Sequence, residues 1–442
     1  MIRVSVAVAV LVLGAGLAGG CGRSGGSAIP RADPSAAVSA GNWTTFGGSS
    51  SRAGVAPGAP AHPHLARRFS KTLDGEVYAQ PLIANGRIYV ATENNTIYAF
   101  TTSGRQVWKR HLGQPVAGGE LPCGNIDPSG ITGAPVITGG RIYAVAFLHD
   151  GLRHILFGLR LKDGRVAVRV NADPPNRQVA QQRGALLASG GRIYIPYGGL
   201  LGDCGDYHGY VLSTTTTGRQ RISYTNPAPK AGIWAPAGIS RQSGTLLVST
   251  GNAGDSRFNF SDSVIRLSPG LRRQGFWAPE QWQSLSANDT DESSLAPLPV
   301  AGGRVFQIGK DGVGYLLSHK LGGIGGELFS HRVCGEGAFG AEAYRAPFVI
   351  VQCGGGNYAL RLEGDRFSLA WHNDAGGMVP VIAGDSVFGI SRGGTLVQMR
   401  MSDGSQVVST DVGGGATSFP QPAAAGNTLV APGGRAIVVF SI

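Results

Sequence analysis

Apolar residues in this chain occur in short runs that alternate with glycine and polar turn residues. Between residues 75 and 113, such runs cover 80–83, 86–90 and 96–100, followed by an ending with Gly104 and Trp108. Runs of this length and punctuation are typical of β-strands. The pattern therefore predicts about four short strands in this segment, with no helix signal between them.

The same pattern recurs along the chain. A Gly-x-apolar-aromatic unit that begins at Gly86 returns at Gly140, Gly191 and Gly303, and more loosely at Gly244, Gly384 and Gly426. A degenerate copy at 346–351 brings the count of units to eight. Units of roughly 40 to 60 residues with several short strands each are typical of propeller blades. We therefore predict an all-β fold: a single eight-bladed β-propeller of four-stranded antiparallel blades over residues 41–442.

The two ends of the repeat region are incomplete. The last unit reaches Ile442 after too few strands, whereas residues 43–54 precede the first complete unit. Stacked blades cover one another's faces, but an incomplete blade leaves an unpaired strand edge. We expect the N-terminal segment, placed at residues 41–56, to supply the missing outer strand of the last blade and to close the ring.

The repeat resembles a known family. Its apolar-Pro-apolar opening, Gly-x-Ile-Tyr-Val strand, Tyr-Ala-Phe strand and Gly-x-x-x-Trp ending are similar to those of the PQQ-like repeat proteins, the quinoprotein alcohol dehydrogenase-like eight-bladed propellers. The likeness covers residues 43–442. In that family a tryptophan at the end of each blade docks it onto the next blade. Trp108 and Trp371 match that position.

Composition agrees with a globular β-protein. The chain has 71 Gly and 25 Pro among 442 residues, which argues against a mainly helical fold, and its 15% of charged residues excludes a disordered chain. The formal net charge is +11, yet no basic run of five or more residues occurs. Basic residues scattered in this way predict no nucleic-acid partner.

The N-terminus indicates export. Met1, Ile2 and Arg3 precede an apolar run, and small residues then lead to Cys21. This arrangement resembles a bacterial lipoprotein signal, so we predict a signal peptide over residues 1–20 and lipidation of Cys21. Residues 21–40 would form a flexible tether, because they are rich in Gly, Ser and Pro. The predicted location is extracytoplasmic, anchored to the cell membrane through the lipid.

Four further cysteines remain in the chain. An even number in an exported protein favours two disulfides, and four cysteines permit three pairings. We favour Cys123–Cys204 and Cys334–Cys353, because each pair would join neighbouring units of the repeat. No Cys-x-x-Cys occurs, which argues against zinc and thioredoxin-like sites.

The resemblance implies a set of candidate site residues. Trp234 matches the tryptophan that forms the floor under the quinone, and Lys310 falls where a cation contacts that cofactor. Asn252 and Asp291 match oxygen ligands of a calcium ion, and Asp291 also matches the catalytic base. The set is chemically coherent, because Ca²⁺ needs oxygen ligands and an anionic planar cofactor needs a cation and an aromatic face.

Three departures weaken the enzymatic interpretation. The carboxylate expected from the third unit is missing, with Cys204 near its register and Asp203 and Asp206 only adjacent. The vicinal cysteine pair of the enzymes and their long insertions are also absent. The sequence therefore favours a monomeric, non-catalytic binding or scaffold module of the cell envelope without a cofactor. It would present one propeller face to an envelope protein or small-molecule ligand. The alternative is a PQQ- and Ca²⁺-dependent dehydrogenase that oxidises alcohols or sugars at the propeller axis.

Overall fold

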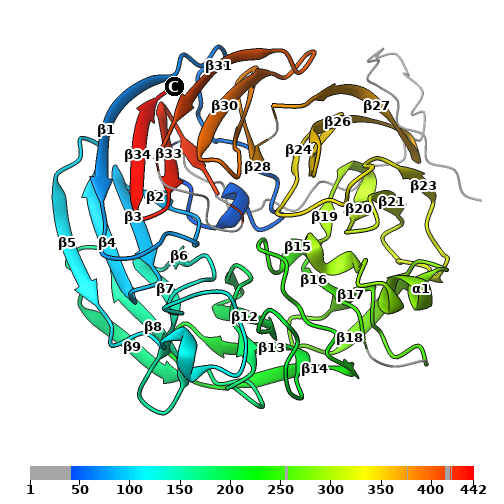
Figure 1. The fold of residues 1–442 in the computed structure, drawn as a ribbon, viewed down its shortest axis with the longest axis horizontal. Coiled ribbons are helices and arrows are strands. Elements are labelled where there is room, and N and C mark those ends of the chain that lie inside the picture. Colours follow the sequence, from blue (N-terminus) through cyan, green and yellow to red (C-terminus); the bar gives the residue numbers. More distant parts are fainter. Residues whose placement is uncertain (1–40, 254–256, 376, 414–418, 420) are drawn as a thin grey trace, which may run out of the picture. The chain divides into compact units, whose positions relative to one another are not determined.

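Eight β-sheets are arranged around a common axis in the computed structural model (Figure 1). The structure describes residues 41–253, 257–375, 377–413, 419 and 421–442. The predicted signal peptide, the tether and Cys21 lie outside the described residues. A membrane-crossing helix of sufficient length and apolar character is not found in the described part of the chain.

The first four blades follow one another along the sequence. Blade 1 contains β2 (Leu82–Ala84), β3 (Arg87–Thr92), β4 (Thr96–Thr101) and β5 (Gln106–His111). Blade 2 contains β6 (Val136–Thr138), β7 (Arg141–Leu148), β8 (Arg153–Arg160) and β9 (Val166–Asn171). Blade 3 contains β10 (Ala180–Gln181), β11 (Leu187–Ser189), β12 (Arg192–Gly199), β13 (His208–Thr215) and β14 (Ile222–Pro229). Blade 4 contains β15 (Ser240–Gln242), β16 (Thr245–Thr250), β17 (Ser263–Leu267), β18 (Arg273–Ala278) and the short added strand β22 (Gly323–Ile324).

The other four blades complete the ring. Blade 5 contains β19 (Leu298–Pro299), β20 (Val305–Ile308), β21 (Val313–Leu317) and β23 (Phe329–Arg332). Blade 6 contains β24 (Ala343–Arg345), β25 (Phe348–Cys353), β26 (Gly356–Glu363) and β27 (Arg366–Asn373). Blade 7 contains β28 (Met378–Ala383), β29 (Ser386–Ile390), β30 (Thr395–Arg400) and β31 (Gln406–Asp411). Blade 8 contains β32 (Ala423–Ala425), β33 (Thr428–Gly433), β34 (Ala436–Ser441) and β1 (Ala66–Thr72).

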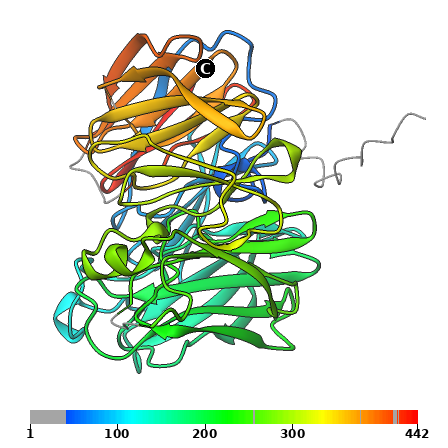
Figure 2. The same cartoon turned by 90° about the vertical axis from the view of Figure 1, so that its right-hand side faces the viewer.

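Helical structure is sparse among the described residues. It consists of α1 (Trp282–Ala287) and the 3-10 turns η1 (Phe46–Gly48), η2 (Gly118–Glu120), η3 (Glu292–Ser294) and η4 (Ala301–Gly303). Viewed from the side in Figure 2, the green blades 3 and 4 and the orange blade 7 stand on opposite sides of the ring. The prediction of an all-β, eight-bladed propeller is confirmed, with one extra strand in blade 3 and one in blade 4.

The repeated glycine marks the turn before the second strand of a blade. Gly140 and Gly191 adopt φ of 71° and 73°, a left-handed backbone conformation that residues other than glycine rarely adopt. The aromatic residue that follows is buried, as at Tyr89, Tyr143 and Tyr194. In these blades one sequence unit therefore sets both the turn and the core contact.

Tryptophans join neighbouring blades as the sequence predicted. Trp108 of β5 donates from Nε1 to Leu161 O of blade 2 at 3.0 Å, and a Cβ on Gly164 would lie only 2.6 Å from its ring. Trp371 of β27 makes the equivalent bond to Met401 O of blade 7 at 3.0 Å, with Gly404 beneath its ring. In both places a glycine leaves the space that the large indole occupies.

Blade 8 combines residues from both ends of the propeller. Strand β1 pairs antiparallel with β34, in a register that places Ala66 opposite Ser441 and Thr72 opposite Ala436. The outer strand of this blade is thus Ala66–Thr72. Residues 41–56, which we had expected to form that strand, have a different role.

Residues 43–57 run across the inner ends of the blades, and we call this segment the N-terminal belt. Trp43 exchanges backbone hydrogen bonds with Ile83 of blade 1 at 2.6 and 3.0 Å. Further along, Ala53 O accepts from Tyr344 of blade 6, and Gly54 O accepts from Ile382 of blade 7, both at 2.7 Å. The belt therefore links blades that are far apart in the sequence, and its η1 turn lies near the centre of Figure 1.

Arg52 is the buried anchor of the N-terminal belt, with 2% of its surface exposed. Its guanidinium donates to Ile239 O at 2.9 Å, Leu186 O at 3.0 Å and, within the belt, to Phe46 O at 3.1 Å and Thr45 Oγ1 at 2.6 Å. Burial lowers the pKa of Arg52 to about 9, so the group stays charged at neutral pH. Four neutral oxygens, rather than a carboxylate, hold this cation in place.

We expect Arg52→Met to lower the stability of the whole propeller. The change leaves buried carbonyl oxygens of blades 3 and 4 without a donor, which costs about 1–3 kcal/mol for each group that water cannot reach. The variant also loses the desolvation penalty of the buried charge, which offsets part of this destabilisation. A net loss of about 2–4 kcal/mol, measured by urea unfolding, is expected. The matched control is Arg345→Met on β24, because Arg345 makes one bond, to Gly384 O. Equal stability of the two variants would contradict an anchoring role for Arg52.

His154 is a second buried group with a thermodynamic consequence. It lies in β8 with 1% of its surface exposed, stacks on Phe147 at a centroid distance of 4.1 Å, and has no hydrogen-bond partner for either ring nitrogen. Burial lowers the pKa of His154 from 6.5 to about 3. The unfolded chain therefore binds a proton more readily than the folded chain at intermediate pH.

We expect His154→Phe to stabilise the protein in acid. In the natural chain, the contribution of the neutral imidazole is complete above pH 6.5 and is lost as the pH falls toward 3, because protonation favours the unfolded state. Phenylalanine keeps the stacked ring but does not titrate, so its advantage should grow to about 3 kcal/mol at pH 4. Urea unfolding from pH 4 to 8 measures this, with His64→Phe at an exposed position as the control. A difference that does not vary with pH would rule out the linkage.

Candidate functional site

The propeller has two different faces. Successive connections in an antiparallel sheet lie at alternate ends of its strands. The links between blades and the connections between second and third strands therefore share one face, which we call the link face. The turns between first and second and between third and fourth strands lie on the other, which we call the turn face. Long connections gather on the link face, including residues 112–135, 172–186, 200–207 and 279–297.

A cavity of about 480 Å³ opens on the link face where these connections converge. Propeller sites commonly form in this way, because loops from several blades meet near the axis. All four residues that the family resemblance singled out line the same cavity. The lining comprises Asn125, Arg183, Gly199, Leu200, Leu201, Gly202, Asp203, Tyr207, Lys230, Trp234, Asn252, Asp289, Asp291, Lys310, Phe339 and Phe419.

Trp234 provides an aromatic wall of the cavity. It lies in the link between β14 and β15, next to Ile233, whose backbone N–H donates to Tyr197 O at 3.1 Å. A Cβ on Gly198 would lie 2.8 Å from the Trp234 Cβ, so only glycine permits this close approach. The indole is therefore held by the backbone of blade 3.

Asn252 enters the cavity directly after β16. The preceding residue, Gly251, donates from its backbone N–H to Gly232 O at 3.0 Å. A Cβ at Gly251 would lie 3.4 Å from Trp234 Nε1 and 3.5 Å from Asp291 Oδ1. Gly251 therefore sits between the indole and the carboxylate and brings three of the candidate residues together.

Asp291 and Lys310 form a buried ion pair. Asp291 caps η3, where its Oδ1 accepts from Ser293 N at 3.0 Å and Ser293 Oγ at 2.7 Å. Its Oδ2 lies 2.7 Å from Lys310 Nζ, and the side chain is fully buried. Lys310 Nζ also contacts Asp289 Oδ1 at 2.6 Å and lies 5.3 Å from the centre of the Trp234 ring system. One ammonium thus contacts two carboxylates beside the indole.

The protonation of this cluster follows from its charges. Burial lowers the pKa of Lys310, but the attraction of Asp291 and Asp289 outweighs burial and raises that pKa above its ordinary value. Lys310 therefore remains an ammonium at neutral pH. Asp203, across the cavity, accepts a hydrogen bond from the Tyr207 hydroxyl at 2.5 Å.

More carboxyl groups lie close behind Asp291. Glu292 is fully buried, and burial followed by the repulsion of Asp311, Asp262 and Asp291 raises its pKa well above the ordinary value. Burial also raises the pKa of Asp262 to about 7, although Ser286 Oγ donates to its Oδ2 at 2.5 Å. Burial also raises the pKa of Asp311, and repulsion between Asp311 and Glu292 favours the protonated form of Glu292. Protonation keeps the charge behind the cavity low.

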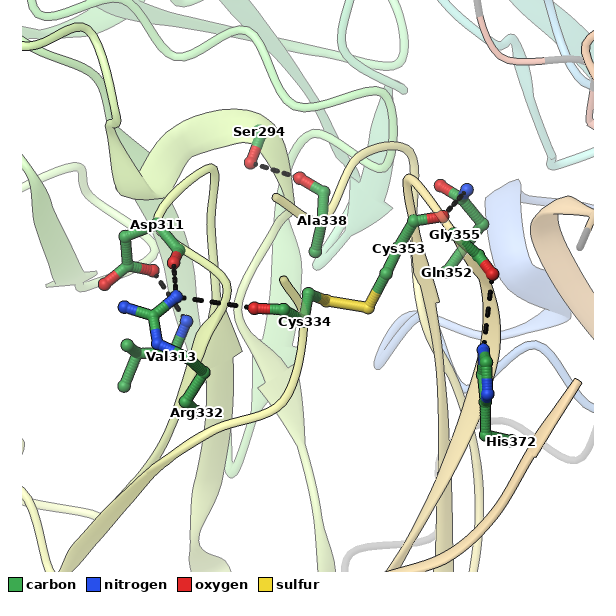
Figure 3. The surroundings of a disulfide bond; sticks show 10 residues. All are labelled: Ser294, Asp311, Val313, Arg332, Cys334, Ala338, Gln352, Cys353, Gly355 and His372. Atoms are coloured by element: carbon green, nitrogen blue, oxygen red, sulfur yellow. Dashed lines mark hydrogen bonds between the residues drawn. A yellow bond between two sulfur atoms is a disulfide. The ribbon is translucent and has the colours of Figure 1, made fainter. Parts of the chain in front are cut away.

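Both predicted disulfides are present. Cys123–Cys204 joins the link after blade 1 to the β12–β13 connection of blade 3, and Cys334–Cys353 joins the link after blade 5 to the end of β25. Figure 3 shows Arg332 donating to Asp311 O at 2.9 Å and to Cys334 O at 3.4 Å, next to the second bridge. A Cβ at Gly337 would lie 2.5 Å from Lys310 O, so the same link packs on the turn that carries Lys310.

The cavity includes residues that sequence reasoning missed. Arg183 comes from the link between blades 2 and 3, Lys230 from the link before Trp234, and the aromatic residues Phe339 and Phe419 from later links. Neither Arg183 nor Lys230 has an ion pair with a carboxylate in the described residues. No motif marks these positions, and the only available signal is that each lies in a link between blades.

Comparisons with known proteins agree with this architecture. The profile of a PQQ-repeat family, described as outer membrane protein assembly factor BamB, matches residues 70–253. No curated protein matches the sequence.

Several solved structures share the fold. The quinohemoprotein alcohol dehydrogenase of Comamonas testosteroni is similar with a TM-score of 0.69 and 15% identity, over 92% of this chain and 81% of that protein. A europium-containing methanol dehydrogenase has a TM-score of 0.70 and 12% identity, over 91% and 98%. BamB from Moraxella catarrhalis has a TM-score of 0.60 and 12% identity, over 86% and 100%. The chain thus has an eight-bladed propeller fold like that of the quinohemoprotein alcohol dehydrogenase and BamB structures, and its residues 70–253 are similar to the PQQ-repeat family.

Proposed function

We propose that this protein is a non-catalytic binding module of the cell envelope that engages a partner through its link face. The observation that carries the proposal is the pairing of Lys310 with two carboxylates in the cavity. Lys310 lies within 2.7 Å of both Asp289 and Asp291, so the carboxylate that would serve as a catalytic base is neutralised within the chain. A general base needs a free lone pair directed at its substrate.

The oxygen atoms that Ca²⁺ would require are also engaged. Asp291 Oδ1 accepts a hydrogen bond from Ser293, and its Oδ2 contacts Lys310 Nζ. Asp203 Oδ1 accepts a hydrogen bond from the Tyr207 hydroxyl. Among the described residues, no three His, Cys, Asp or Glu side chains are grouped closely enough to hold a metal ion. A calcium ion needs six to eight oxygen ligands, so the residues present do not fit it.

A loop at the cavity rim is suited to partner binding. Leu201 lines the cavity with 55% of its surface exposed, three residues before the Cys123–Cys204 bridge. A Cβ on the intervening Gly202 would lie 3.6 Å from Cys123 Cβ, so the loop packs against the disulfide. An exposed apolar side chain on a braced loop binds with little loss of conformational entropy. The match to the BamB family profile supports an envelope role, and lipid attachment at Cys21 would place the module at the membrane.

We expect Leu201→Glu to abolish capture of the envelope partner. Chemical crosslinking of intact envelopes followed by purification of the protein should give a crosslinked species that falls at least fivefold in this variant. Leu369→Glu is the matched control, because Leu369 is 57% exposed but lies on the outer strand β27. Equal loss in the two variants, or no loss in either, would argue against partner binding at the cavity rim.

The second candidate is a quinone-dependent dehydrogenase, favoured by the meeting of Trp234, Asn252, Asp291 and Lys310 in one cavity. Titration with PQQ, with and without Ca²⁺, separates the two functions. A binding module should show no saturable quinone binding at tens of micromolar and no dye-linked oxidation of alcohols or sugars. Saturable binding that is weakened by both Trp234→Ala and Asp291→Ala, accompanied by turnover, would establish the dehydrogenase instead.

A further inference from the structure

A second cavity, of about 380 Å³, lies on the turn face. One wall is the N-terminal belt, through Thr44, Thr45, Ser49 and Ser50, and the opposite walls come from blades 2, 3 and 4. The cavity shares no lining residue with the one on the link face. The belt therefore creates a separate chamber that the propeller repeats alone would not form.

The chemistry of this chamber is cationic and rich in hydroxyl groups. Arg192 and Arg241 line it, together with Thr138, Ser189 and Thr216, and no acidic side chain of the described residues does so. Arg192 is bound to Ser213 and Gln220, which fixes its guanidinium through neutral oxygens. The positive charge in the cavity is thus not balanced by a carboxylate of its own lining.

Arg241 is the available cation. Its backbone N–H donates to Ser50 O at 2.8 Å, which places it against the belt, but its side-chain Nε is buried without a hydrogen-bond partner. The half-buried Arg241 side chain forms no ion pair with a carboxylate of the described residues, so its positive charge is available to an anion in the cavity. Arginine favours oxyanions in particular, because its planar fork matches two oxygens of a phosphate or carboxylate.

Arg52 adds positive charge directly behind the cavity wall. It donates to Thr45 Oγ1 at 2.6 Å, and Thr45 itself lines the cavity. A hydroxyl that accepts from a cation still has its own proton to donate, and it donates more strongly when polarised in this way. Thr45 can therefore donate a strengthened hydrogen bond to an anion in the cavity.

We propose that this chamber binds a phosphate ester carried on a small hydroxylated body. Arg241 and the polarised Thr45 would hold the phosphate, and the hydroxyl side chains of Ser50, Thr138, Ser189 and Thr216 would bind the rest of the ligand. The volume is far larger than one phosphate requires and lies within the range of small-molecule sites. The same chemistry occurs in soluble sugar or glycerol phosphates and in phospholipid headgroups. This inference is independent of the function proposed for the link face.

The test is calorimetric titration of the purified protein with glycerol 3-phosphate, glucose 6-phosphate, inorganic phosphate and glucose, with vesicle binding measured in parallel. We expect saturable binding of at least one phosphate ester, weaker binding of inorganic phosphate and none of glucose. Binding only to phosphatidylglycerol vesicles, and not to phosphatidylcholine vesicles, would identify the lipid headgroup as the source. If no ester binds below 10 mM and neither vesicle type binds, the proposal is wrong.

Substitutions of residues that line the chamber test whether the ligand binds there. Arg241→Gln should raise the dissociation constant at least tenfold, Arg241→Lys should restore part of the affinity, and Thr138→Val should weaken the ester more than inorganic phosphate. Arg345→Gln, at an inner-strand arginine of blade 6 outside the chamber, is the control and should bind normally. Arg241 Nε donates no hydrogen bond to the described residues, so the variant should unfold at the wild-type temperature. Unchanged affinity in folded Arg241→Gln would overturn the assignment.

Discussion

The pairing of β1 with β34 is the contact on which the rest of the propeller depends. Eight blades bury their faces only when each has a neighbour on both sides, and this pair completes the blade that closes the circle. The N-terminal belt adds a second closure, because its backbone bonds and the buried Arg52 join blades that are not adjacent in sequence. With the ring fixed in this way, loops from distant parts of the chain meet at the axis and form the two cavities.

The two cavities differ because the protein balances charge differently at each. On the link face, Lys310 contacts Asp289 and Asp291, and burial favours a protonated Glu292 behind them. On the turn face, neither Arg52 nor Arg241 forms an ion pair with a carboxylate of the described residues, and Arg52 donates to carbonyl and hydroxyl oxygens. One scaffold thereby has a link-face cavity lined by both acidic and basic side chains and a turn-face cavity whose described lining includes basic but no acidic side chains.

Much of the fold could be predicted from the sequence, because most units repeat a glycine at the turn and a buried aromatic residue after it. The disulfides followed from the repeat register, and Trp234, Asn252, Asp291 and Lys310 indeed meet in one cavity. The belt could not be predicted, because Trp43 and Arg52 contact blades far away in sequence and no local periodicity marks such contacts. For the same reason Arg183, Lys230 and the chamber around Arg241 were missed.

The closing pair also determines when the fold can become complete. Ala66 and Ser441 are opposite each other in the sheet, so β1 is synthesised long before its partner exists. Until blade 8 is synthesised, β1 has no partner strand, and an open strand edge of this kind favours aggregation or chaperone binding. The Arg67, Arg68 and Lys71 side chains of β1 place charges along that strand. Charged side chains along a strand edge disfavour non-native pairing with other strands.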